Sequence, residues 1–161
     1  PKELILFNNC NLKRKINFNL SKDSNLLLCE NIIFGRTSMK EEFEKGYFSD
    51  FWNINIDNKL IHTEAINTGL FEKKYLNSFS TLNNNSAVAT IIIVGNKFLN
   101  NVNNLSETLT NNENTTSNYS YWDNKLIVRL LSKDSYNLKF AIDKILSYFF
   151  EGSKIPKVWN I

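Results

Sequence analysis

Residues 26–42 read LLLCENIIFGRTSMKEE, and this stretch is the clearest fold signal in the sequence. Its long apolar run, rich in β-branched residues, is typical of a strand that is buried on both faces, and Gly35 supplies the turn that ends it. Glu30 interrupts the run. A buried carboxylate is unfavourable unless it is paired, hydrogen-bonded or bound to a ligand. We therefore expect Glu30 to be buried and paired, with Arg36 as its first candidate partner.

Further strand-like segments lie on both sides of this run. They show either an alternation of apolar and polar residues or a continuous apolar run. They cover residues 3–7, 13–20, 52–56, 60–66, 87–95 and 126–131. The turn residues Asp57, Asn58 and Lys59 predict that two of these strands form a β-hairpin.

Two segments have apolar residues at helical spacing, which predicts helices over residues 98–109 and 138–149. Asp134 or Ser135 is placed to cap the start of the second helix, and Gly152 follows its end. The polar residues 110–120 are expected to be irregular. Because the regular βαβ alternation of a parallel fold is absent, the sequence predicts a mainly β fold with two helices toward the C-terminus. We expect layered, mostly antiparallel sheets and not a doubly wound α/β fold.

Composition excludes several classes of protein. The 161 residues are 42% hydrophobic and 13% aromatic, which fits one globular domain with a real core. The net charge of +3 is mild and the longest basic block is a triplet at 13–15, so no nucleic-acid partner is expected. No run of 18 apolar residues and no signal peptide is present, so we expect no membrane association and a cytoplasmic location. Two cysteines without CxxC spacing indicate neither a disulfide scaffold nor a zinc site.

No catalytic constellation can be assigned from the sequence. His62 is the single histidine, and no motif surrounds a nucleophile that it could activate. The five glycines have neither dinucleotide-binding nor phosphate-loop spacing. His62 can be a strand-surface residue, or it can serve a metal path beside Glu64, which points to the same strand face. No cluster has the spacing of a tight metal site.

Four ordered motifs resemble the urease accessory protein family UreD, also called UreH. They are PKELILFNNCNLKRKINFNL at residues 1–20, ENIIFGRTSMKE at 30–41, GYFSDFWNI at 46–54 and IPKVWN at 155–160, where Lys157 replaces the family's usual Arg. The family's N-terminal half, with its Gly-rich motifs, has no counterpart in these residues. We therefore expect a single domain segment over residues 1–161 that resembles the C-terminal part of a UreD-type protein and depends on association for its stability.

The resemblance implies a predominantly β protein that is not an enzyme. It implies a scaffold or chaperone for nickel insertion, which binds apo-urease and UreF-like and UreG-like accessory proteins. No cofactor is expected to be tightly bound, and nickel is the transferred cargo. The alternative function is a β-sandwich binding module for a peptide or carbohydrate, which exposed aromatic residues along one sheet face would favour.

The candidate residues fall into three groups. Glu30, His62 and Glu64 are candidates for a transient nickel path, while Glu30 can instead be a purely structural partner of Arg36. Glu41 and Glu42 begin a charged run that is typical of a solvated face. The motifs also single out residues with expected structural roles, with Trp159 as a packing residue or a partner anchor. They are Gly35, Arg36, Glu41, Gly46, Trp52, Pro156 and Trp159.

Overall fold

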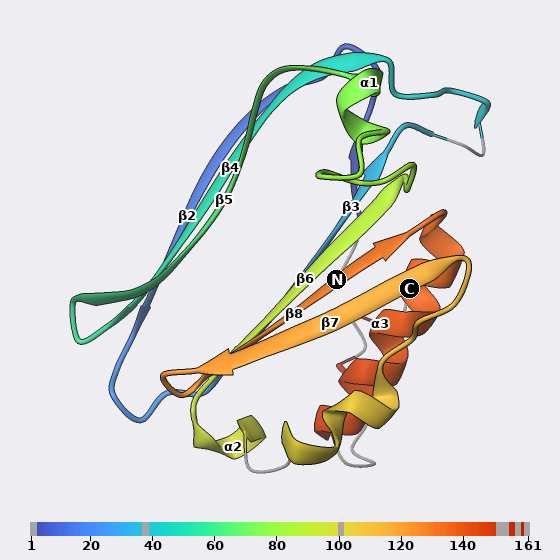
Figure 1. The fold of residues 1–161 in the computed structure, drawn as a ribbon. Coiled ribbons are helices and arrows are strands. Elements are labelled where there is room, and N and C mark those ends of the chain that lie inside the picture. The colour runs from blue at the N-terminus through green and yellow to red at the C-terminus, as the bar shows by residue number, and fades with distance from the viewer. Residues whose placement is uncertain (1–2, 37–38, 100–101, 151–154, 157–158, 160–161) are drawn as a thin grey trace.

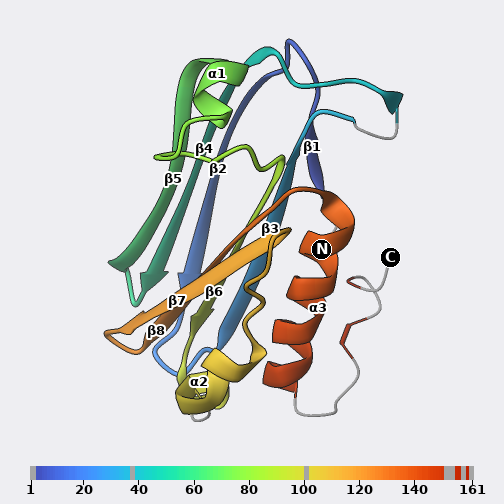
Figure 2. The same ribbon diagram turned by 45° about the vertical axis from the view of Figure 1, so that its right-hand side comes forward.

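The computed structural model describes residues 3–36, 39–99, 102–150, 155–156 and 159. It has three layers, which are visible in Figure 1: a curved three-stranded sheet, a five-stranded sheet and the long helix α3 (Ser135–Phe150). Figure 2 shows α3 lying along the five-stranded sheet, on the side away from the three-stranded sheet. Two interfaces follow from this order, one between sheet and helix and one between the sheets.

The five-stranded sheet has the order β1-β3-β6-β8-β7. Only β1 and β3 pair in parallel; the other neighbours are antiparallel. Its strands are β1 (Leu4–Leu6), β3 (Leu26–Phe34), β6 (Ala87–Val94), β8 (Lys125–Ser132) and β7 (Thr115–Trp122).

The three-stranded sheet has the order β2-β4-β5, with β2 parallel to β4 and β4 antiparallel to β5. Its strands are β2 (Asn11–Leu20), β4 (Lys45–Ile56) and β5 (Lys59–Glu72). Asp57 and Asn58 both have positive φ in the tight turn between β4 and β5. This turn confirms the predicted hairpin, whose strands are longer than expected.

The alternation of side chains along β6 and β8 explains both interfaces. Every second residue of these strands packs against the apolar stripe of α3. The remaining residues face the three-stranded sheet. The central strand β6 is therefore buried on both faces, as its continuous apolar sequence predicted. Asp134 caps α3: its Oδ1 accepts a hydrogen bond of 2.8 Å from the backbone N–H of Asn137.

Two predictions of local structure are corrected. In place of one helix over 98–109, the structure has the short helix α2 (Asn96–Leu99) and the 3-10 helix η2 (Val102–Thr108). The segment expected to be irregular, residues 110–120, contains most of β7, an edge strand with several exposed polar residues. The polar sequence of β7 did not predict a strand, because β7 is stabilised by its pairing with β8. Gly152 and Lys157 lie outside the described residues.

The predicted fold class is confirmed: the protein is mainly β, with two mostly antiparallel sheets and α3 as its one longer helix. A short helix, α1 (Lys73–Leu76), follows β5. Within the described ranges, no helix has the length and apolar character needed to span a bilayer.

Candidate functional site

A layer of polar side chains crosses the apolar core between the two sheets. On one side of it lies an apolar cluster that includes Ile32 and Phe48, and on the other side a cluster that includes Ile54 and Ile92. We call this layer the polar belt. It consists of Arg14 on β2, Glu30 on β3, Asp50 on β4, Glu64 on β5, Thr90 on β6 and Arg129 on β8.

Strand register places these residues opposite one another. In the five-stranded sheet, Glu30 pairs with Thr90 and Thr90 pairs with Arg129, so the three side chains form one row. In the three-stranded sheet, Arg14 pairs with Asp50. The two rows face each other because all five residues occupy the strand positions that point between the sheets.

Arg14 holds two carboxylates from different sheets. Its Nε and Nη2 donate to Asp50 Oδ1 and Oδ2 at 2.9 and 2.6 Å, and Nη2 also donates to Glu30 Oε1 at 2.6 Å. Asp50 is only 3% exposed and accepts a further hydrogen bond of 3.0 Å from Trp52 Nε1. The guanidinium also lies 5.8 Å from the centre of the Trp52 ring. The charge-assisted, bidentate contact fixes both the position and the orientation of the Asp50 carboxylate.

A second arginine closes the other end of the belt. Arg129 donates to Glu64 at 3.0 and 2.8 Å and to Thr90 Oγ1 at 3.1 Å. Glu64 is buried, whereas the Arg129 side chain is 54% exposed. Arg129 therefore covers a buried carboxylate from the solvent side.

The predicted pairing of Glu30 with Arg36 is wrong. Arg36 instead forms an ion pair with Glu41, through both Nε and Nη2, where residues 36 and 41 form an isolated β-bridge. The physical reason is distance: Arg36 lies six positions beyond Glu30, which is roughly 20 Å along an extended chain. Glu30 is also not fully buried, because 20% of its side chain is exposed.

Burial and hydrogen bonding act in opposite directions on the pKa values of Glu30 and Arg14. Burial raises the pKa of the Glu30 carboxyl, although its hydrogen bond to Arg14 acts against this shift. The hydrogen bond from Arg14 to Asp50 raises the pKa of the guanidinium, so Arg14 stays charged. The hydrogen bond from Arg14 therefore favours the ionised form of Glu30, which burial disfavours.

His62 lies beside the belt on β5. Its side chain is 11% exposed and its Nε2 is 3.6 Å from Glu64 Oε2, beyond hydrogen-bond range. Nε2 is buried and has no hydrogen-bond partner among the described residues. Burial lowers the pKa of His62, and the nearby Glu64 carboxylate opposes that shift. The strand-surface alternative does not fit this burial, and the His62 ring packs against that of Trp122 on β7, with 6.5 Å between the ring centres.

The belt is closely packed in the middle and open at its ends. A cavity of only about 10 Å³, the space of roughly one water molecule, lies among Glu30, Asp50, Glu64 and Thr90. Next to it, Glu64, Thr90 and Arg129 also line an open groove of about 490 Å³. At the other end, Arg14 is 27% exposed. The belt thus meets solvent mainly at its two arginines.

The glycines of the motifs occupy tight positions. Gly35 has φ +86°, and a Cβ there would lie 2.8 Å from the carbonyl oxygen of Glu41 and 2.9 Å from the backbone nitrogen of Phe43. A Cβ on Gly46 would lie 2.9 Å from Cys10 Sγ. Both glycines allow backbone segments to approach closely.

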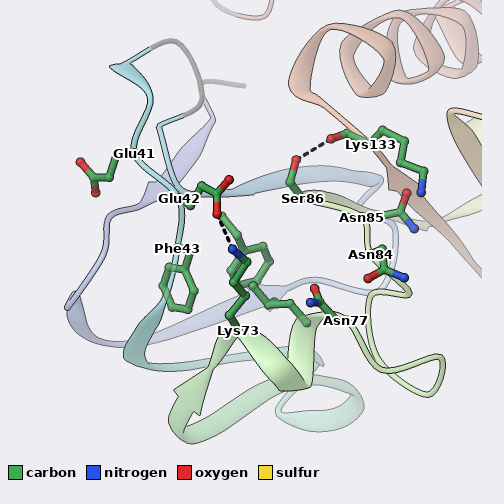
Figure 3. Close-up of a pocket in the computed structure, with 11 residues that line it drawn as sticks. Glu41, Glu42, Phe43, Lys73, Asn77, Asn84, Asn85, Ser86 and Lys133 are labelled. Carbon is green, nitrogen blue, oxygen red and sulfur yellow. Dashed lines mark hydrogen bonds and ion pairs between the residues drawn. The ribbon is translucent and has the colours of Figure 1, made fainter.

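The acidic residues after Arg36 lie at a separate pocket of about 300 Å³ beneath α1. Figure 3 shows Lys73 reaching Glu42 in this pocket, with Glu41 at its edge. Glu42 is exposed, and Glu41 also accepts a hydrogen bond of 2.8 Å from the backbone N–H of Asn8. These carboxylates thus belong to surface ion pairs and lie apart from the polar belt.

The two tryptophans of the motifs both pack. Trp52 is buried in the inter-sheet core. Trp159 is partly buried against the core beneath α3, with its ring centre 6.0 Å from that of Phe150. Pro156, two residues after the described gap, is exposed.

Sequence reasoning missed Arg14, Asp50 and Arg129 as site residues. The signal was present for two of them: Arg14 continues the buried alternation of Ile16 and Phe18, and Asp50 continues that of Trp52. A charged residue in phase with a buried face is a candidate for an interior ion pair. Among the described residues, no group of three or more His, Cys, Asp or Glu side chains is arranged to hold a metal ion.

Comparison with known proteins identifies similar chains. The sequence model described as "UreD urease accessory protein" matches residues 1–160. A urease accessory protein UreD from Rhizobium leguminosarum bv. viciae is 32% identical over 164 residues, which cover 100% of this chain and 58% of the relative. The UreD protein of Agrobacterium fabrum is 28% identical over 165 residues, covering 100% of this chain and 55% of the relative. The chain thus spans less than three fifths of the length of these curated relatives.

Proposed function

Because the chain belongs to the UreD urease accessory protein family, a family of non-catalytic proteins, we propose that it serves as a scaffold for nickel insertion into apo-urease. The match over residues 1–160 is the observation that carries this proposal. In this role the protein acts in the cytoplasm with UreF-like and UreG-like partners, and nickel is its cargo.

The polar belt supports a path for nickel through the protein. Carboxylate oxygens are suitable ligands for a divalent cation, and Glu30, Asp50 and Glu64 line one cavity between the sheets. His62 adds a buried ring nitrogen beside Glu64. Because arginines already occupy these carboxylates, a cation is held weakly, which suits transfer better than storage.

Urease activation in cells tests the proposal. A bacterium that expresses urease and its other accessory proteins, but no UreD, should regain urease activity and urease-bound nickel when it expresses this protein. Glu30→Gln should lower both readouts, because the neutral amide is a poorer cation ligand. Glu113→Gln is the matched control, since Glu113 is exposed, precedes β7 and is not part of the belt.

Two results would count against the proposal. If the unmodified protein is soluble but does not restore urease activity, the proposed accessory role is contradicted. If Glu30→Gln and Glu113→Gln activate urease equally, the belt is not the nickel path. Co-purification of the Glu30→Gln variant with a UreF-like partner separates loss of transfer from loss of assembly.

The alternative of a peptide- or carbohydrate-binding module gains little support from the sheet surface. The large exposed aromatics of β7 are Tyr121 and Trp122. As neighbours in one strand they point to opposite sides of the sheet, so they form no row on one face.

A further inference from the structure

Arg14 has an unusual position for an interior arginine. It reaches from the three-stranded sheet to Glu30 on the other sheet, and it also holds Asp50 on its own sheet. Its guanidinium therefore occupies the space where the two carboxylates converge. The cavity that Glu30 and Asp50 line has room for about one water molecule, which is too little for a hydrated metal ion.

The charges of the belt are not balanced. Glu30, Asp50 and Glu64 contribute three carboxylates, whereas Arg14 and Arg129 contribute two guanidiniums. One negative charge is left over when all groups are ionised. Without Arg14, two negative charges would be left over, which matches the charge of a divalent cation.

Arg14 can also leave the site. Its side chain is 27% exposed at the rim of the belt, whereas Asp50 is 3% exposed. A guanidinium on a long side chain can swing into solvent, where it is well hydrated, while the carboxylates stay in place. The exchange of Arg14 for a cation therefore needs no rearrangement of either sheet.

We propose that Arg14 is a resident counter-ion, which occupies Glu30 and Asp50 between transits and keeps a divalent cation from binding there tightly. The inference rests on the proposed function for the identity of the cargo, but it concerns the affinity of the site alone. A passing cation displaces the guanidinium from the carboxylates, and the returning guanidinium displaces the cation. Arg14 thereby sets how long the ion stays.

Isothermal titration of the purified protein with nickel chloride tests this role. Arg14→Gln should bind one Ni²⁺ per chain at least about tenfold more tightly than the unmodified protein, because a positive charge beside the ion is removed. Arg36→Gln is the matched control, since it deletes a guanidinium that pairs with Glu41 away from the belt. Arg14→Lys retains the charge and should show no gain.

A second substitution locates the new site. Adding Asp50→Asn to Arg14→Gln should abolish the gain in affinity, because it removes one of the two carboxylates that Arg14 held. A folded Arg14→Gln variant with the nickel affinity of the unmodified protein would overturn the proposal. An equal gain in Arg36→Gln or Arg14→Lys would overturn it as well.

Arg14→Gln can fail to fold without metal, because it leaves a buried carboxylate unpaired. Circular dichroism during nickel addition covers this case: recovery of the folded spectrum supports the proposal, and persistent unfolding, with Arg14→Lys folded, contradicts it. These outcomes are independent of urease activation, which tests nickel delivery by the unmodified protein. A failed titration would therefore leave the proposed accessory role standing.

Discussion

Arg129 and Glu64 join the two sheets of the sandwich. Nη1 and Nη2 of Arg129 on β8 donate to the two carboxylate oxygens of Glu64 on β5, at 3.0 and 2.8 Å. The residues are 65 positions apart in the sequence. The pair therefore reports directly on the docking of one sheet onto the other.

Removal of Arg129 should destabilise the fold. Arg129→Met leaves the buried Glu64 carboxylate without its two donors, at a cost of about 1–3 kcal/mol in the free energy of unfolding. The exposed side of the guanidinium keeps this cost below that of a fully buried pair. Urea denaturation of both proteins provides the measurement. Adding Glu64→Gln should recover part of the loss, and a double variant that is less stable than Arg129→Met would contradict the pairing.

Gly35 should tolerate no side chain. Gly35→Ala should cost about 1–3 kcal/mol of stability, because φ is +86° and the new Cβ would collide with the backbone of Glu41 and Phe43. Gly69→Ala is the matched control: Gly69 has φ +57°, but nothing lies within 4 Å of its Cβ position. Its substitution should cost less. Equal melting temperatures for the two variants would show that the collision has no effect.

His62 should make stability fall as the pH is lowered toward 5.5. The pKa of His62 is lowered in the folded protein. Below the ordinary histidine pKa of about 6.5, the unfolded chain therefore binds more protons than the folded protein. Acidification thus stabilises the unfolded chain relative to the folded protein. Glu30, whose pKa is raised, acts in the opposite direction at lower pH. The difference between the unmodified protein and His62→Gln isolates the contribution of the only histidine. Parallel curves of unfolding free energy against pH would refute this prediction.

Asp134 should contribute a measurable helix cap. Asp134→Ala removes the acceptor for the Asn137 backbone N–H and should lower stability by about 0.5–2 kcal/mol. Asp134→Ser, which keeps a capping oxygen, should restore most of this loss. Thermal unfolding followed by circular dichroism gives both values, and an unaffected alanine variant would rule out the cap.

Much of the fold could be predicted from local pattern. The apolar run at 26–34 and the alternation in β2, β4 and β5 predicted strands, because burial on one or both faces leaves a direct trace in the sequence. β7 was missed because its residues are polar and its stability comes from pairing with β8. The helix predicted over 98–109 is instead a short α-helix and a 3-10 helix, because tertiary packing can override a local period.

The site was predictable only in part. Glu30 was found because a carboxylate in an apolar run is conspicuous. Its partner Arg14 was missed, because sequence proximity favoured Arg36 and the contact depends on how two sheets dock. Long-range partners of this kind depend on strand register and on the order of the layers, which local sequence patterns do not predict.

The route of the chain through the sandwich has a consequence for cooperativity. The first four strands alternate between the layers, with β1 and β3 in one sheet and β2 and β4 in the other. Neither sheet is therefore a continuous piece of sequence, and neither can be excised by cutting a single loop. The two sheets should melt in one step, so a proteolytic cut between β2 and β3 should release no stable fragment.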